Sequence, residues 1–210
     1  MSKRLRIPKK NHEEFFHSQG FINIVGIDEV GRGAWAGPLV AAAVKLPASQ
    51  RLYRIRDSKL LTSREREKLA QKIKNSRAIF SIGIVKVAEI NRIGLGQALN
   101  TAYKRALTGL AIRPDFVLVD GARIKNLGLP QKAIVKGDLF CASIAAASII
   151  AKVARDRLMR QLAKTYRGYG FEKNKGYGTK WHRNALAKYG ACKIHREYRP
   201  IKKIKNQNFK

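Results

Sequence analysis

The chain has 210 residues with 44 Lys or Arg and 14 Asp or Glu, which gives a formal net charge of +30 at pH 7. Hydrophobic residues make up 45%, enough for a folded core, so the composition excludes a disordered basic tail. Cys141 and Cys192 fit neither a zinc-binding nor a redox spacing, and we find no secretory signal and no run long enough to span a bilayer. We therefore expect a soluble, cytoplasmic monomer whose partner is a polyanion.

Both ends of the chain are predicted to be basic arms around a single domain. Residues 1–10 contain five basic residues and no acid, and residues 193–210 contain seven basic residues and one acid. We find no internal repeat, low-complexity segment or linker between them. The predicted organisation is an N-terminal arm over 1–20, one folded domain over 21–200 and a C-terminal tail over 201–210.

The first half of the chain predicts a hairpin, a helix and a third strand. Residues 21–28 and 39–46 are rich in β-branched or small apolar residues, so we expect two strands joined by the glycine-rich turn 30–38. A capping-box pattern predicts a helix over 62–75, and residues 78–87 predict the next strand.

The second half alternates between helices and short strands. Apolar residues recur at helical intervals over 88–110, whereas 116–119 is too short for anything but a buried strand. Another short strand is expected over 133–135, followed by a long helix over 139–166. This alternation favours an α/β fold in which helices flank a mixed central sheet.

Acidic side chains occur at three predicted strand ends in a chain that has few acids. Asp28 and Glu29 end the first strand, Asp120 ends the strand over 116–119, and Asp138 follows the strand over 133–135. Ligands of open α/β sheets bind beyond strand ends, and carboxylates gathered there repel one another unless cations neutralise them. Oxygen ligands select hard cations, so we expect Mg²⁺ or Mn²⁺.

Two ordinary explanations compete with this metal site. Asp is common in turns after strands, and Asp120-Gly121 is a frequent turn pair. Adjacent strand residues also point to opposite faces, so Asp28 and Glu29 cannot both reach one ion from a regular strand. A bulge would redirect one side chain; otherwise Glu29 contributes through its backbone carbonyl or binds a second ion.

Seven segments form an ordered set of motifs. They are GIDEVGRGAWAGPLVAAAV (26–44), DSKLL (57–61), VLVDG (117–121), KGD (136–138), AAASIIAKVARDRLM (145–159), NKGYGT (174–179) and HREYRP (195–200). Together they resemble the type 2 ribonucleases H, specifically the bacterial ribonuclease HII family, over about residues 24–200. One DEVGRG match alone would be weak, but seven segments in family order make the resemblance specific.

The resemblance implies an RNase H-like fold and a metal-dependent endoribonuclease. Its expected substrates are RNA in RNA·DNA hybrids and single ribonucleotides embedded in duplex DNA, incised on the 5′ side to leave 3′-hydroxyl and 5′-phosphate ends. The family's catalytic carboxylates fall on Asp28, Glu29, Asp120 and Asp138, the acids that strand-end position also identifies. The expected mechanism is hydrolysis with two divalent ions.

The resemblance also identifies candidate nucleic-acid contacts. The family's glycine-arginine-glycine motif falls on Gly31, Arg32 and Gly33, where glycines let the backbone approach a ribose 2′-hydroxyl, although a plain tight turn would also need glycines. The family's tyrosine falls on Tyr177, which would stack on the deoxyribose after the ribonucleotide. Lys59 matches a phosphate-contacting position, against the alternative of a solvated charge.

Three further expectations concern residues near these motifs. We expect Arg155 and Asp156 to form a structural pair, and His182 and His195 to be surface or packing residues rather than metal ligands. Asn174 stands where the family pattern usually has histidine.

Three other function classes are less well supported. Ribonuclease HIII carries an extra N-terminal domain, and only about 20 residues precede the first predicted strand. Type 1 ribonucleases H place their glutamate on a helix, not beside the first aspartate. A purely RNA-binding protein would explain the charge, but strand-end carboxylates in such a protein would only repel phosphate.

Overall fold

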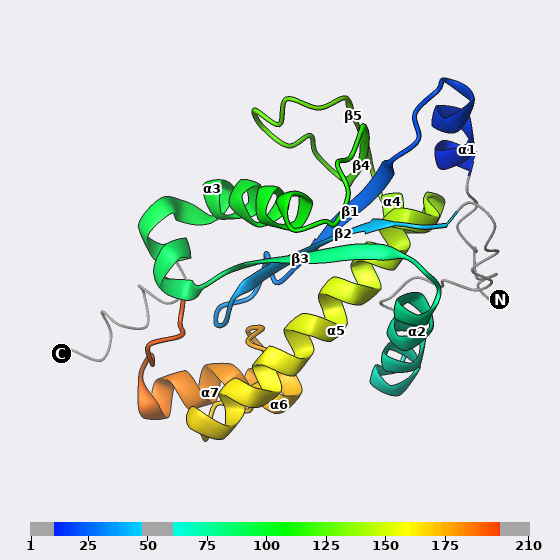
Figure 1. Ribbon diagram of the computed structural model, residues 1–210. Helices are drawn as coiled ribbons and strands as arrows, with labels where there is room; N and C mark the ends of the chain where they lie inside the picture. Colours follow the sequence, from blue (N-terminus) through cyan, green and yellow to red (C-terminus); the bar gives the residue numbers. More distant parts are fainter. Residues whose placement is uncertain (1–10, 48–60, 198–210) are drawn as a thin grey trace, which may run out of the picture.

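The computed structural model describes residues 11–47 and 61–197. At its centre is a five-stranded sheet with the strand order β3-β2-β1-β4-β5 (Figure 1). The strands are β1 Ile24–Val30, β2 Leu39–Lys45, β3 Ile79–Val85, β4 Phe116–Asp120 and β5 Gln131–Ile134. Each predicted strand is present within a few residues of its expected bounds, and the expected α/β fold with a mixed sheet is confirmed.

The sheet is mixed because an antiparallel hairpin and a parallel pair share β1. Strand β1 pairs with β2 in the antiparallel sense and with β4 in the parallel sense. Strand β4 continues the parallel order to β5. The carboxyl ends of β1 and β4 therefore lie side by side at one edge of the sheet, which is where the acidic residues are.

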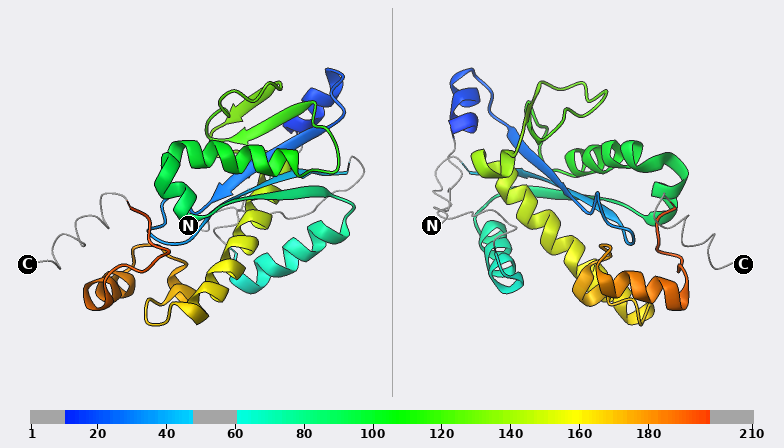
Figure 2. Two further views of the ribbon diagram at one scale, coloured as in Figure 1. Left: turned by 60° about the vertical axis from the view of Figure 1, so that its left-hand side comes forward. Right: turned by 180° about the vertical axis from the view of Figure 1, so that it is seen from behind.

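Helices cover both faces of the sheet (Figure 2). Helix α3 (Val87–Thr108) packs on one face, while α5 (Ala142–Thr165) and α2 (Ser63–Asn75) pack on the other. The capping box that opens α2 is present, since the Thr62 side chain accepts a hydrogen bond from the backbone N–H of Glu65. Alternate residues of each central strand thus enter two separate cores, which explains why β1 and β2 are buried on both faces.

The two long helices are less regular than the sequence pattern predicts. The expected helix over 139–166 is interrupted, because Cys141 is extended (φ −119°, ψ 126°) and separates the single turn α4 (Gly137–Phe140) from α5. Helix α3 contains a kink at Gly94, whose φ of 78° is outside the helical region. A glycine is well suited to that position because a side chain would strain a backbone with positive φ.

Part of the segment predicted as an N-terminal arm is packed against the domain. Residues Asn11–Ser18 form helix α1. The ring of Phe16 stacks on Phe116 at 3.9 Å, and buried Glu13 accepts hydrogen bonds from the backbone N–H and side chain of Ser143 at the start of α5. Residues 1–10 and 201–210 lie outside the described residues, so the basic arms stay predictions.

Two helices that the sequence analysis did not predict complete the domain. Helices α6 (Phe171–Asn174) and α7 (Lys180–Tyr189) pack against the end of α5 around a small apolar cluster (Figure 1). The signal for α7 was Thr179, whose side chain accepts a hydrogen bond from the backbone N–H of His182. No helix in the described ranges is long and apolar enough to cross a membrane.

Candidate active site

Asp28 and Asp120 are neighbours at the ends of parallel strands. The last paired residues of β1 and β4 are Ile27 and Val119, so the two aspartates occupy the next position on each strand. Residues in register on parallel strands point to the same face. Both carboxyl groups therefore lie on the α5 face of the sheet.

Helix α5 approaches this face very closely. A Cβ atom on Gly26 would lie 2.3 Å from the carbonyl carbon of Ser143, so only glycine fits there. The close approach brings Ser148 of α5 to Asp28, whose carboxyl it hydrogen bonds. Asp28 is only 6% exposed as a result.

Glu29 points to the opposite face, as the alternation of a regular strand requires. The pairing of β1 with β2 is uninterrupted from Gly26 to Val30, which excludes a bulge in this ladder as the way to redirect a side chain. Tyr103 of α3 donates a hydrogen bond to the Glu29 carboxylate. The backbone N–H of Glu29 donates to the Asp28 carboxylate over 2.7 Å, so the two acids are linked through the main chain.

Asp120 and Asp138 are connected through the turn that begins α4. The backbone N–H of Gly137 donates to the Asp120 carboxylate over 2.7 Å, and Asp138 follows in the first turn of α4 with 3% exposure. The turn is set by Lys136, whose φ is 57°. All four predicted carboxylates are therefore at the same edge of the sheet.

The carboxylates nevertheless do not converge on one point. Within residues 11–47 and 61–197, no group of three or more Asp, Glu, His or Cys side chains is close enough together to hold a metal ion. Asp28 and Asp120 lie on one face and Glu29 on the other, which accounts for the spread. Their expected role as metal ligands stays a prediction.

The electrostatics of the edge favour a cation. Burial, followed by the charges of Glu29 and Asp120, raises the pKa of Asp28 to about 8, and burial also raises the pKa of Glu29. Burial and the neighbouring carboxylate raise the pKa of Tyr103, which keeps its hydroxyl a donor. An all-oxygen set of acids matches the donor chemistry of Mg²⁺ or Mn²⁺, and a cation would favour the charged forms of Asp28 and Glu29.

The glycine-arginine-glycine loop lies at the carboxyl end of β1. Gly31 has φ of 100°, and a Cβ there would lie 2.2 Å from Nε of Arg155. Gly33 is different, since a Cβ added to it would meet nothing within 4 Å, and both Arg32 and Gly33 are exposed. The loop thus has one buried glycine that it needs for packing and one open glycine whose backbone can be approached.

The loop that carries Tyr177 is fastened to this glycine loop. The carbonyl of Gly176 accepts hydrogen bonds from the backbone N–H groups of Trp35 (2.8 Å) and Ala36 (3.2 Å). Asn174 shapes the turn, because its side chain accepts a hydrogen bond from the backbone N–H of Gly176 and donates one to the carbonyl of Tyr169. Tyr177 lies 149 residues after Asp28 in the sequence, and these hydrogen bonds bring it beside the glycine-arginine-glycine loop that follows β1.

Two buried arginines stabilise this arrangement, and the sequence analysis missed both roles. Arg155 donates to the carbonyls of Ala36 (3.1 Å), Pro38 (2.9 Å) and Lys175 (2.9 Å), and its Cζ lies 5.4 Å from the centre of the Tyr177 ring. Arg196 donates to the carbonyls of Gly37 (3.0 Å) and Arg32 (3.3 Å). Both lie in motifs that the resemblance identified, but only the fold reveals the carbonyls they bind.

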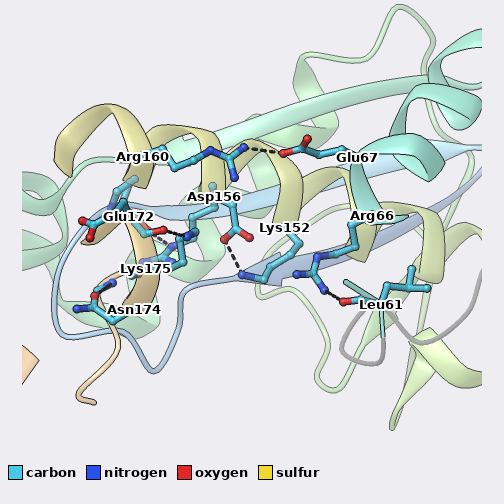
Figure 3. Close-up of polar contacts among 12 residues, drawn as sticks. Leu61, Arg66, Glu67, Lys152, Asp156, Arg160, Glu172, Asn174 and Lys175 are labelled. Atoms are coloured by element: carbon cyan, nitrogen blue, oxygen red, sulfur yellow. Dashed lines mark hydrogen bonds and ion pairs between the residues drawn. The ribbon is translucent and has the colours of Figure 1, made fainter. Parts of the chain in front are cut away.

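The expected pairing of Arg155 with Asp156 is wrong. Adjacent helical residues point in different directions, so Asp156 instead pairs with Lys152 one turn earlier, at 2.5 Å (Figure 3). The same view contains the contact of Arg160 with Glu67, which joins α5 to α2 at 2.7 Å. Lys59 lies outside the described residues, so its role as a phosphate contact stays a prediction.

The family model and the curated relatives identify one family. The family model described as Ribonuclease HII matches residues 25–205. A ribonuclease HII of Desulfitobacterium hafniense is 51% identical over 177 residues, 84% of this chain and 68% of the relative. The crystal structure of ribonuclease H2 from Pyrococcus horikoshii is 28% identical, with a TM-score of 0.75 over 89% of this chain and 98% of that one. The RNase HII of a PCNA complex from Archaeoglobus fulgidus is 27% identical, with a TM-score of 0.74 over 89% and 97%.

Proposed function

This chain belongs to the ribonuclease HII family and is therefore an endoribonuclease, and from that premise we propose that it incises duplex DNA 5′ to a single embedded ribonucleotide as well as cleaving RNA in RNA·DNA hybrids. The observation that carries the proposal is the attachment of the Tyr177 loop to the glycine-arginine-glycine loop, directly after the acidic end of β1. One loop suits recognition of a ribose and the other suits recognition of the nucleotide that follows it. Side by side, they can test for an RNA-to-DNA junction.

The glycine loop supplies the ribose contact in this proposal. The 2′-hydroxyl is both donor and acceptor, and it is the group that distinguishes RNA from DNA. The backbone around exposed Gly33 has no side chain in the way, while Arg196 and Arg155 fix the loop from behind. A rigid backbone can reject a deoxyribose because its polar groups would then lose a partner.

Tyr177 supplies the junction contact. Its ring is partly buried and lies against the Arg155 guanidinium, which orients it without covering it fully. A ring that packs on a sugar makes no base-specific contact. Tyr177 can therefore contact the sugar that follows the ribonucleotide in any sequence. The cations of a chain with net charge +30, Lys59 and the basic arms among them, would hold the phosphates.

The four carboxylates supply the chemistry in this proposal. Asp28, Glu29, Asp120 and Asp138 would hold two Mg²⁺ or Mn²⁺ ions, which when bound activate the water and stabilise the leaving oxygen. Asp28 and Asp120 would offer their oxygens from the α5 face of the sheet and Glu29 from the other face. The oxygen of water forms a new bond to phosphorus as the bond from phosphorus to the 3′-oxygen breaks, and the 3′-oxygen gains a proton, which leaves a 3′-hydroxyl and a 5′-phosphate.

A cleavage assay on two substrates tests the proposal. The protein is incubated with Mg²⁺ or Mn²⁺ and either a duplex with one ribonucleotide or a uniform RNA·DNA hybrid. We expect cleavage of both, and we expect Tyr177→Ala to lower incision at the single ribonucleotide about tenfold or more, as loss of a stacked contact does. Tyr189→Ala is the matched control, because Tyr189 is 53% exposed on α7 and lies outside both loops. Failure of the wild-type protein to incise the single-ribonucleotide duplex would contradict the proposal.

A further inference from the structure

Two histidines form a buried pair beside the Tyr177 loop. His182 of α7 is 0% exposed and His195 of the C-terminal segment is 4% exposed. Their Nε2 atoms lie 3.0 Å apart. Two imidazole nitrogens at this distance share a single hydrogen, since one must donate and the other accept.

The remaining contacts determine which nitrogens carry hydrogen. The backbone N–H of Cys192 donates to Nδ1 of His195 over 2.9 Å, so that Nδ1 is an acceptor and the hydrogen of His195 is on Nε2. The Cys192 carbonyl, 3.2 Å from this Nδ1, accepts instead from the backbone N–H of His195. Nε2 of His182 must then accept, which places the hydrogen of His182 on Nδ1. That Nδ1 lies 2.9 Å from the carbonyl of Tyr177.

These contacts form one directional chain of hydrogen bonds, which we call the histidine relay. It runs from the Cys192 N–H to His195, from His195 to His182, and from His182 to the Tyr177 carbonyl. Both rings are neutral in this chain. Protonation of His182 would put an N–H on its Nε2 against that of His195 and break the central hydrogen bond, whereas protonation of His195 would put an N–H on its Nδ1 against the backbone N–H of Cys192.

The surroundings keep the relay neutral. The side chains packed around the pair in the described part of the chain are Trp35, Tyr169, Phe171 and Cys192. Tyr169 and Cys192 can titrate, but burial raises the pKa of both, so neither is charged near pH 7. Burial also lowers the pKa of His182.

The relay joins the Tyr177 loop to residues 35–37, which follow the glycine-arginine-glycine loop. His195 forms an isolated β-bridge with Ala36, and the flanking residues bind the same segment, since Gly37 donates to the carbonyl of Ile194 and Arg196 donates to that of Trp35. The carbonyl of Gly176 is already bound by Trp35 and Ala36. The peptide group before Tyr177 is thus hydrogen-bonded directly to residues 35–36, and the peptide group after Tyr177 is connected to the same segment through the two histidines.

We propose that His182 and His195 are positioning residues that set Tyr177 against the glycine-arginine-glycine loop through the histidine relay, and so support recognition of the RNA-to-DNA junction. This inference rests on the proposed function of Tyr177. It gives the two histidines a role in substrate discrimination that does not involve metal binding or contact with the reacting atoms.

Nuclear magnetic resonance of the imidazole nitrogens tests the relay without any substrate. We expect His195 to be protonated on Nε2 and His182 on Nδ1 at pH 7.5 in the full-length, metal-free protein, with the four histidines of the chain assigned from single variants. The opposite tautomer of either ring, or a charged ring, would overturn the relay. This measurement remains valid even if the protein fails to incise single ribonucleotides, so it separates the relay from the proposed function.

Two conservative variants of His195 test its effect on recognition. His195→Gln places an amide nitrogen near the position of Nε2 and keeps the donor to His182, whereas His195→Asn is shorter and keeps only the acceptor for Cys192. We expect His195→Asn to lower incision at a single ribonucleotide about tenfold relative to cleavage of a uniform hybrid, and His195→Gln to restore most of that loss. Equal losses on the two substrates would overturn a positioning role.

A double-mutant cycle excludes a merely structural effect. In a Tyr177→Ala background the relay has no ring to position, so adding His195→Asn should change the ratio of the two cleavage rates less than twofold. Tyr169→Phe is the matched control, because it removes a hydrogen bond to the Gly190 carbonyl from the same cluster but leaves the relay intact. A full additive loss in the Tyr177→Ala background, or a tenfold loss of discrimination in Tyr169→Phe, would overturn the proposal.

Discussion

The carboxylate edge of the sheet and the Tyr177 loop are built in opposite ways. At the edge, strand ends hold acidic groups that are buried or half-buried, and burial together with the charges of Glu29 and Asp120 raises the pKa of Asp28 to about 8. In the loop region, each polar group of the histidine relay has a partner and both rings are neutral. Asp28 needs a nearby cation to be charged at neutral pH, whereas the histidine relay is complete without one.

This difference separates two tasks within one site. A metal site needs ligands that are placed by the fold and that give up their protons when the ion binds, so metal binding and ionisation of Asp28 are coupled. A recognition loop works best when its backbone is fixed before the substrate arrives, because little conformational entropy is then lost. Each region can be weakened separately, and the following variants do so from the largest expected effect to the smallest.

Loss of a carboxylate should have the largest effect, on activity. Asp138→Asn replaces one of the proposed metal ligands at a position only 3% exposed, and we expect cleavage of both substrates to fall about 10³-fold, equivalent to about 4 kcal/mol in the barrier. Titration of Mg²⁺ and Mn²⁺ against rate should show a weaker apparent affinity. Glu172→Gln, which removes an exposed acid of α6, is the control. If Asp138→Asn kept its activity within threefold of the wild type, Asp138 would not be one of the catalytic carboxylates.

The same edge should be destabilising when no metal is bound. Because the pKa of folded Asp28 is raised from 3.8 to about 8, the stability it confers is present below pH 4 and is lost as the pH rises to about 8. Asp28→Asn, which mimics the neutral acid, should therefore stabilise the metal-free protein at pH 8 by roughly 2–4 kcal/mol and change it little at pH 4. Urea denaturation with a chelator at both pH values measures this. Equal effects at the two pH values would contradict the assigned cause.

The contrast between these regions also explains what the sequence could and could not predict. The four acids were predictable because each lies within the last residues of a short apolar strand or shortly after it, so a local pattern places it at the edge. The break at Cys141 was not, because the turn before it depends on Asp120 accepting from Gly137 across 17 residues. Helix α1 was hidden in a basic segment, since its packing depends on Phe116 and Ser143, far along the chain.

Long-range contacts to backbone carbonyls were the least predictable part of the site. Arg155 binds carbonyls of the glycine loop 117 and 119 residues away, and no spacing in the sequence distinguishes it from the surface arginines. Tyr103 lies in the helix predicted over 88–110, and nothing in that pattern indicated that its hydroxyl binds Glu29. His182 and His195 were expected to be surface or packing residues; both are buried, but their hydrogen bonds required the fold.

The two glycines of the glycine-arginine-glycine loop should differ in stability. Gly31→Ala combines a φ of 100° with a Cβ 2.2 Å from Arg155, so we expect a loss of about 2 kcal/mol in the free energy of unfolding. Gly33→Ala has open space and should change stability by less than about 0.5 kcal/mol while lowering incision at a ribonucleotide. Thermal denaturation and cleavage assays on both variants check the comparison. Similar stabilities for the two would contradict the packing role of Gly31.

The smallest expected effect is that of the hydroxyl of Tyr103, which links the α3 core to the edge. Tyr103→Phe keeps the ring, 4% exposed in the core, and removes only the donor to Glu29. Without metal, the Glu29 carboxyl loses this donor, but it can take up a proton and so avoid being a charged group without its hydrogen bond. The loss of stability should therefore be about 1 kcal/mol. With metal the freed carboxylate is less well oriented, and we expect cleavage to fall about three- to tenfold on both substrates alike. Because the histidine relay is unchanged, the ratio of the two cleavage rates should stay within twofold of the wild type. A selective loss of cleavage at the single ribonucleotide would mean that the carboxylate edge and the Tyr177 loop do not act independently.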